Sequence, residues 1–140
     1  MIKSTKVSEI MSNNIIVANE SHKFSQVCRL FLEFNLHHLP VVDANNKIIG
    51  IISSSDALRL YCYESPIIGS ADPDVLDSKL PLSGMMTPNP FTISADDTIG
   101  YAAEMMVKYH VQSLPVADES GVVIGIVTSR DLVKEFALYG

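Results

Sequence analysis

Apolar and polar residues follow each other in the same order twice along this chain. In each half, four apolar residues recur with the i, i+3, i+4, i+7 spacing of one buried helix face. These residues are Phe24, Val27, Cys28 and Phe31 in the first half, and Ile99, Ala102, Ala103 and Met106 in the second. Ser94 and Asp97 precede the second stripe with capping-box spacing. The pattern predicts one amphipathic helix in each half, the second capped at Ser94.

Short apolar runs with turn residues between them predict the strands. A run that ends at Asp43 or Asp118 is followed by Asn45-Asn46 or Ser120-Gly121 and then by a second run, which indicates a β-hairpin. We expect a short strand before each amphipathic helix, and a last helix after each hairpin that turns two apolar residues inward. In the first half, the strands are expected at 15–17 and 48–52, and the last helix starts at Ser53 and turns Ala57 and Leu58 inward. In the second half, the strands are expected at 91–93 and 122–127, and the last helix starts at Thr128 and turns Leu132 and Val133 inward.

The two halves match at a constant offset of 75 positions without a gap. Leu39-Pro40-Val41-Val42-Asp43 aligns with Leu114-Pro115-Val116-Ala117-Asp118. Each copy is a βαββα unit too small to bury a stable core alone, so we predict an α+β fold in which two pseudo-symmetric repeats pack sheet to sheet as one module and leave two equivalent clefts. The predicted organisation is repeat 1 at 1–60, a linker with one short helical turn at 61–81, and repeat 2 at 82–140.

The most informative phrase is Gly50-Ile51-Ile52-Ser53-x-x-Asp56, which returns as Gly125-Ile126-Val127-Thr128-x-x-Asp131. It describes a strand that ends at a helix N-terminus, where free N–H groups and the helix dipole favour an anion. The aspartate could accept two hydrogen bonds from a vicinal diol such as that of ribose. The same spacing is also that of a capping box, which any helix can use.

A second phrase leads into each hairpin: Leu36-His37-His38-Leu39-Pro40 and Val111-Gln112-Ser113-Leu114-Pro115. A proline ring and a branched side chain could form an apolar slot for a purine, whose edge the backbone at 15–17 or 91–93 would read. The alternative is an ordinary strand-entry turn with a core leucine.

Composition narrows the class of protein. Hydrophobic residues make up 47% of the 140 residues and the formal net charge is −6, which indicates a folded chain and argues against a nucleic-acid partner. The sequence has no apolar run long enough for a membrane span and no signal-peptide pattern at its start, so we expect a cytoplasmic location. Cys28 and Cys62 are expected to be free thiols.

Metal and catalytic chemistry are not indicated. His37 and His38 are neighbours, and neighbouring residues on a strand point to opposite faces, so with His22 and His110 they do not predict a metal site. They are interpreted as loop residues that could contact a phosphate or make binding depend on pH. The Ser53–Asp56 run has no base beside its hydroxyls, so we expect no enzyme activity.

Both copies resemble CBS motifs, the tandem repeats named after cystathionine β-synthase. The resemblance rests on the joint occurrence, twice, of the glycine-to-aspartate phrase and the hydrophobic-x-x-hydrophobic-Pro phrase, and it covers nearly the whole chain. It implies a regulatory module that binds AMP, ADP, ATP or S-adenosylmethionine and signals by a conformational or assembly change. It also implies a homodimer and an effector protein that the sequence does not name.

The resemblance assigns ligand contacts in each repeat, with the aspartate on the ribose hydroxyls and the hydroxyl residue beside the ribose-phosphate. The second-repeat site comprises Phe91, Thr92, Val111, Gln112, Ser113, Pro115, Thr128, Arg130 and Asp131, with Arg130 for phosphate charge. The first-repeat site comprises Ile16, Val17, Leu36, His37, His38, Pro40, Ser53, Ser55 and Asp56, and Ser55 stands where the second repeat has Arg130. The alternative is a dimerisation or interaction module with degenerate, empty clefts.

Overall fold

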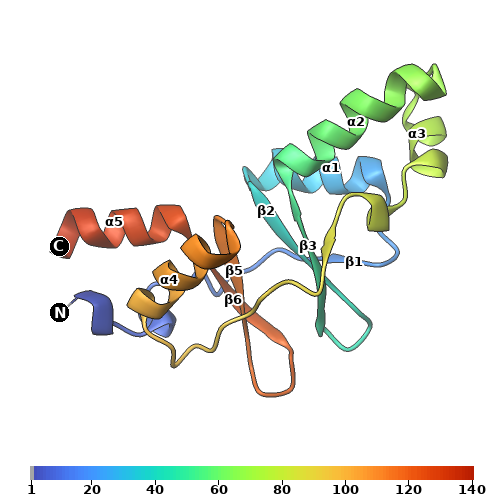
Figure 1. Ribbon diagram of the computed structural model, residues 1–140. Coiled ribbons are helices and arrows are strands. Elements are labelled where there is room, and N and C mark those ends of the chain that lie inside the picture. The colour runs from blue at the N-terminus through green and yellow to red at the C-terminus, as the bar shows by residue number, and fades with distance from the viewer. Residues whose placement is uncertain (1) are drawn as a thin grey trace. The chain divides into compact units, whose positions relative to one another are not determined.

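The computed structural model describes residues 2–140 and divides them into two compact units. The first-repeat unit consists of residues 16–45 and 49–89, and the second-repeat unit of residues 2–15, 46–48 and 90–140. Each unit has its own buried apolar cluster, and each places its helices against a small sheet (Figure 1). The expected α+β fold of two βαββα repeats is therefore confirmed.

The first-repeat unit is built on a four-stranded sheet in the order β1-β2-β3-β4. β1 is parallel to β2 and β4 is antiparallel to β3. Two helices complete the repeat, and the first buries Phe24, Val27 and Phe31 as its stripe predicts. The elements are β1 (Ala18–Asn19), α1 (Phe24–Phe34), β2 (His38–Val42), β3 (Ile48–Ser53), α2 (Ser54–Ile68) and β4 (Thr87–Pro88).

The second-repeat unit has the same order of elements. A hairpin of two antiparallel strands follows a helix that buries Ile99, Ala102 and Met106, again along the predicted stripe. Single bridges from Ser12 to Ile126 and from Ile93 to Val116 stand where the first-repeat unit has β4 and β1. The elements are α4 (Ile99–Tyr109), β5 (Ser113–Ala117), β6 (Val123–Thr128) and α5 (Ser129–Tyr139), with short 3-10 helices η1 (Ile2–Ser4) and η2 (Val7–Glu9).

Each repeat is completed by the leading segment of the other. The first residues of repeat 1, 2–15, belong to the second-repeat unit, where Val7 is fully buried and Ser12 bonds to β6. The first residues of repeat 2, 82–89, belong to the first-repeat unit, where Met85 is buried and β4 bonds to β3. The chain therefore crosses from one unit to the other close to each candidate site.

The segment 61–81 holds more helix than the one short turn predicted. α2 continues to Ile68, and a further helix, α3 (Pro73–Lys79), starts after the Asp72 cap. Leu76 and Leu80 are buried in the core of the first-repeat unit. The Asp77 carboxylate accepts hydrogen bonds from the Ser25 N–H (2.7 Å) and hydroxyl (2.6 Å), which fastens α3 to the start of α1. A 3-10 helix, η3 (Leu82–Gly84), follows.

Three local predictions were wrong. Thr98, and not Ser94, caps α4, because the Asp97 carboxylate accepts from Ser94 N–H in a turn before the helix. The strands expected at 15–17 and 91–93 shrink to β1 and to one bridge at Ile93. The last apolar pair of each repeat splits: Ala57 is buried and Leu132 partly buried, whereas Leu58 and Val133 are 63% and 66% exposed.

Candidate functional site

The second repeat contains a strand-to-helix junction with an acidic side chain. β6 ends at Thr128, whose side chain caps α5 by accepting from Asp131 N–H at 3.2 Å. The Thr128 N–H and hydroxyl both donate to Asp131 Oδ2, at 2.8 and 3.0 Å. Among residues 2–140, nothing hydrogen-bonds or ion-pairs with Asp131 Oδ1. The capping box thus occupies one carboxylate oxygen and leaves the other available.

The first repeat builds the same junction at the end of β3. Ser53 caps α2 by accepting from Asp56 N–H at 3.0 Å, and Ser53 N–H donates to Asp56 Oδ2 at 3.1 Å. Here Oδ1 lies 3.6 Å from Nη1 of Arg59, one turn further along α2. The Asp56 side chain is 30% exposed and Arg59 is 66% exposed, so this ion pair is screened by water and weak.

Backbone hydrogen bonds join the two predicted phrases in each repeat. Ser129 N–H donates to the Gln112 carbonyl and Ser54 N–H donates to the His37 carbonyl, both at 2.9 Å. Ser113 also pairs directly with Thr128 across β5 and β6. The residues before each hairpin therefore lie against the start of the last helix, as a shared site requires.

The short segment before each amphipathic helix borders the same strand. Ile93 N–H donates to the Pro115 carbonyl at 3.1 Å, which puts the neighbouring Phe91 and Thr92 close to the β5 loop. Ala18 pairs with Val41 of β2 and holds Ile16 and Val17 in the corresponding place. The structure thus gathers the predicted residues of each site within one unit.

Exposure separates residues that could touch a ligand from those that only support the site. Pro40 and Pro115 are among the fully buried side chains, so they shape the loop from inside. Val111 is 38% exposed, and Phe91 is partly buried with its ring stacked on Tyr109 at a centroid distance of 4.8 Å. Arg130, Ser55, Gln112 and His37 are exposed at the surface.

The two junctions differ in their positive charge. Arg130 gives the second repeat a permanent cation beside Asp131, whereas the first repeat has Ser55 at that position and His37 and His38 at the entry to the hairpin. His38 is the first residue of β2, so the prediction that it is a loop residue was wrong. Burial lowers the pKa of His38 below its ordinary value, and the charge of His37 lowers it further, while Asp56 opposes both. The imidazole is therefore biased towards its neutral form.

A cavity of about 260 Å³ opens beside Asp56 in the first-repeat unit. Asp56 is the one predicted site residue that lines this cavity, and the other lining residues come from further along α2 and from the segment around η3. These residues are Arg59, Leu60, Tyr63, Glu64, Gly84 and Met85. Sequence reasoning missed the residues around η3 because this leading segment of repeat 2 packs with repeat 1.

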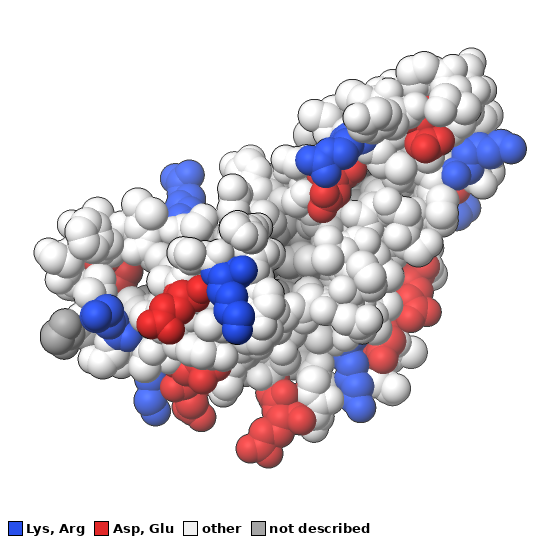
Figure 2. Space-filling model, in the orientation of Figure 1, with Lys and Arg blue, Asp and Glu red and all other residues white. Residues whose placement is uncertain are grey.

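Within residues 2–140 there is no group of three or more His, Cys, Asp or Glu side chains that could hold a metal ion. In the same described range, no helix is both long and apolar enough to cross a membrane. Positive side chains are scattered among negative ones on the face that Figure 2 shows, without a basic patch.

The model of the CBS domain matches this sequence twice, at residues 7–63 and 82–138. The chain belongs to the CBS domain family. The CBS domain pair of a protein designated MJ0100, solved with 5′-methylthioadenosine and S-adenosyl-L-methionine, is 30% identical over 94% of this chain and 99% of that one, with a TM-score of 0.80. CBSX2, solved with AMP, is 25% identical over 96% and 97% of the two chains, with a TM-score of 0.78.

Curated relatives include much longer proteins. An L-aspartate semialdehyde sulfurtransferase of Methanocaldococcus jannaschii is 30% identical over 94% of this CBS domain pair, which spans 23% of that protein. The pair therefore corresponds to about a quarter of such a relative.

Proposed function

We propose that this CBS domain pair is a regulatory module that binds an adenosine-containing ligand at the strand-to-helix junction of each repeat. The ligand class is AMP, ADP, ATP or S-adenosylmethionine, and the output is a conformational or assembly change read by an effector protein. The proposal is supported by the two similar domain pairs solved with AMP and with S-adenosyl-L-methionine and 5′-methylthioadenosine.

The observation that carries the proposal is the free oxygen of Asp131. A ribose diol needs two acceptor positions on one carboxylate, and Oδ1 offers both of its lone pairs while Oδ2 anchors the side chain to Thr128. The capping box therefore orients the carboxylate before any ligand arrives. Such preorganisation lowers the entropic cost of binding.

The second-repeat site is the better site for a phosphorylated ligand. Arg130 is the second residue of α5, where its cation adds to the positive end of the helix dipole. The adenine would lie against Val111 and Phe91, whose side chains are partly exposed beside the loop. We propose Thr92, Gln112 and Ser113 as backbone or polar contacts at the edge of this slot.

Nothing in these sites resembles a catalytic arrangement. Within residues 2–140, the Ser53 and Thr128 hydroxyls hydrogen-bond only to the aspartate of their own capping box, and a carboxylate held in this way caps the helix and does not activate a nucleophile. We therefore propose a binding module without enzyme activity of its own.

We also propose that the module assembles as a homodimer through its last helices. Leu58, Tyr63 and Ile67 of α2 are 63%, 68% and 79% exposed, and Val133, Phe136 and Leu138 of α5 are 66%, 69% and 62% exposed. Leu58 and Tyr63 stand 75 positions before Val133 and Leu138, so the two helices expose equivalent apolar positions. Exposed apolar faces of this kind mark protein interfaces, and a two-fold dimer would bury the same face on both copies.

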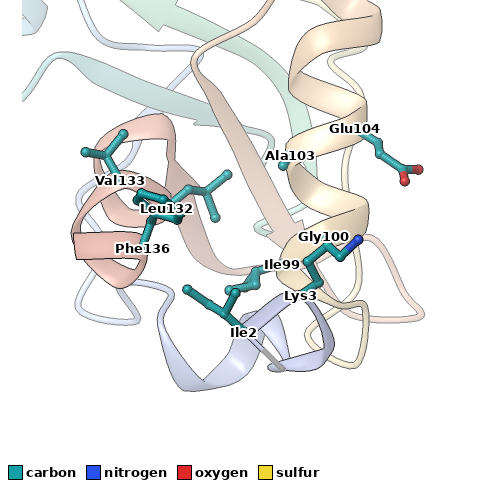
Figure 3. Close-up of a pocket in the computed structure, with 9 residues that line it drawn as sticks. All are labelled: Ile2, Lys3, Ile99, Gly100, Ala103, Glu104, Leu132, Val133 and Phe136. Carbon is teal, nitrogen blue, oxygen red and sulfur yellow. The ribbon is translucent and has the colours of Figure 1, made fainter. Parts of the chain in front are cut away.

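The apolar surface on α5 continues into a cavity of about 430 Å³ (Figure 3). In this view Leu132 of α5 points towards Ile99 and Ala103 of α4, with Ile2 below them, and Phe136 and Val133 complete the α5 side of the lining. The mainly apolar lining fits a side chain from a second copy better than a nucleotide, whose phosphates need donors.

A thermal-shift screen with AMP, ADP, ATP and S-adenosylmethionine tests the binding function. A ligand at a hundredfold over its Kd that binds only the folded state stabilises it by about 2.7 kcal/mol, which raises the melting midpoint by several degrees. Asp131→Ala should reduce the shift, whereas Asp96→Ala, which removes an 85% exposed carboxylate of the same unit, should keep it. A protein that no adenosine ligand shifts would instead be an interaction module with empty sites.

A further inference from the structure

The two junctions differ in the kind of positive charge that their residues supply. The second repeat carries the permanent cation of Arg130 and has Gln112-Ser113 at the entry to its hairpin. The first repeat has Ser55 in place of the arginine and His37-His38 at the entry to its hairpin. At the first-repeat junction, the basic side chains are thus the imidazoles of His37 and His38 and the guanidinium of Arg59, which is paired with Asp56.

His38 is close to the part of the junction where a ligand would bind. It is the first residue of β2, and its counterpart 75 positions later, Ser113, pairs directly with Thr128. The preceding His37 carbonyl accepts from Ser54 N–H at the start of α2. His38 is partly buried, and the charges of both His37 and Asp56 act on its ring. A phosphate at the N-terminus of α2 would therefore lie near this imidazole.

We propose that the first-repeat junction is a proton-linked phosphate site, in which protonated His38 meets the anion that Arg130 meets in the second repeat. This inference rests on the proposed function, since it needs an adenosine ligand at the junction. It predicts that a phosphorylated ligand binds the first repeat more tightly as the pH falls. A ligand without phosphate binds there without this dependence.

The direction follows from the groups around the ring. In the free protein, burial and the charge of His37 favour the neutral imidazole, while Asp56, partly engaged by Arg59, favours the charged form. A bound phosphate adds negative charge and raises the pKa of His38, so binding takes up a proton. The guanidinium of Arg130 stays charged throughout the physiological range, so the second repeat has no such linkage.

Calorimetry on an Asp131→Ala background isolates the first-repeat site. AMP and adenosine are titrated at about pH 6 and about pH 8 into this variant and into the Asp131→Ala/His38→Ser variant, which carries the serine of the second repeat. Because the phosphate of AMP itself titrates near pH 6, the informative quantity is the ratio of the two affinities at each pH. A His110→Asn change on the same background controls for loss of an imidazole, because His110 caps α4 in the other unit with a left-handed backbone that asparagine tolerates.

We expect the His38 protein to bind AMP roughly three- to tenfold more tightly than the serine variant at the lower pH and equally at the higher pH. Adenosine should show a ratio near one at both. An AMP ratio that does not change with pH overturns the inference, and so does an Asp131→Ala protein that binds neither ligand while the wild type binds AMP. In both cases the proposed function survives at the second repeat; it fails if the wild type binds no adenosine ligand.

Discussion

Ser12 and Ile126 exchange two backbone hydrogen bonds, from Ser12 N–H to the Ile126 carbonyl at 2.9 Å and from Ile126 N–H to the Ser12 carbonyl at 3.0 Å. Ser12 belongs to the leading segment of repeat 1, and Ile126 belongs to the site phrase of repeat 2. The bonds bring the Met11 side chain against Gly125, where a Cβ would lie 2.6 Å from the Met11 sulfur and 3.0 Å from the Ser12 carbonyl oxygen. This close approach explains why the phrase contains glycine.

Gly125→Ala should lower the free energy of unfolding by about 1–3 kcal/mol, because the added methyl group has to displace the Met11 sulfur and a backbone carbonyl. Gly84→Ala is the control, since a Cβ there would have no neighbour closer than 3.9 Å and should cost less than about 0.5 kcal/mol. Denaturant titrations measure both. Equal stability of the two variants would show that the Met11 packing carries no energy.

The capping role of Thr128 can be separated from ligand binding. Thr128→Ala removes the acceptor for Asp131 N–H and should cost about 1 kcal/mol of stability without any ligand, whereas Thr128→Ser keeps that acceptor and should restore most of the loss. Thermal unfolding of the ligand-free variants checks this. A Thr128→Ser variant as unstable as Thr128→Ala would contradict the assignment.

His38 should also make the stability of the ligand-free protein depend on pH. Its pKa is lower in the folded state than in the unfolded chain, so the unfolded chain binds more protons below its ordinary pKa. The contribution of neutral His38 is therefore present above about pH 6.5 and is lost as the pH falls from there towards the folded-state pKa. The melting midpoint should decrease more steeply with falling pH in the wild type than in His38→Ser. An equal pH dependence of the two midpoints would refute this prediction.

The internal repeat predicted most of the fold. Because the offset between the two halves is constant, each weak local pattern occurs twice at equivalent positions, and the second occurrence strengthens the interpretation of the first. The hairpins, the helix stripes and the capping residues Ser53 and Thr128 all follow from residues that are close in sequence. The exchange of leading segments between the repeats could not be predicted in this way. Met11 and Met86 are apolar residues in short segments, and the sequence of these segments does not indicate which sheet they join.

The wrong predictions around the candidate site also arise because local sequence patterns do not determine tertiary packing. Leu58 and Val133 follow a buried or partly buried neighbour in the sequence, but a step of about 100° around the helix turns them outward. Thr98 caps α4 because it directly precedes the helix, a distinction of four residues from Ser94 that spacing alone does not resolve. Pro115 was predicted to contact the ligand and lies on a strand of the site, but its side chain is fully buried, which depends on tertiary packing.

The two cysteines should react at different rates. Burial raises the pKa of the Cys28 thiol and the nearby Asp77 charge raises it further, while Cys62 is exposed. Because the thiolate is the nucleophile, Cys62 should react first with iodoacetamide at neutral pH and Cys28 much later. Mass spectrometry of Cys28→Ser and Cys62→Ser variants measures each thiol alone. Faster labelling of Cys28 than of Cys62 would show that α3 does not shield the Cys28 thiol of α1 from the reagent.

The proposed homodimer depends on the exposed face of α5. Phe136→Glu should shift the protein towards the monomer in sedimentation velocity, because a carboxylate replaces an aromatic ring that we expect to be buried between copies. Lys134→Glu changes the charge of the same helix at another exposed position and should leave the dimer intact. A monomeric wild type at high micromolar concentration would contradict the dimer.

The contact between a ribose diol and the Asp131 carboxylate is tested most directly by a cycle that removes each partner. On an Asp56→Ala background, calorimetry compares AMP with its 2′,3′-dideoxy analogue, with and without Asp131→Ala. We expect loss of the diol to weaken binding at least about tenfold when Asp131 is present and hardly at all when it is absent. An equal loss in both proteins would show that the aspartate only caps its helix.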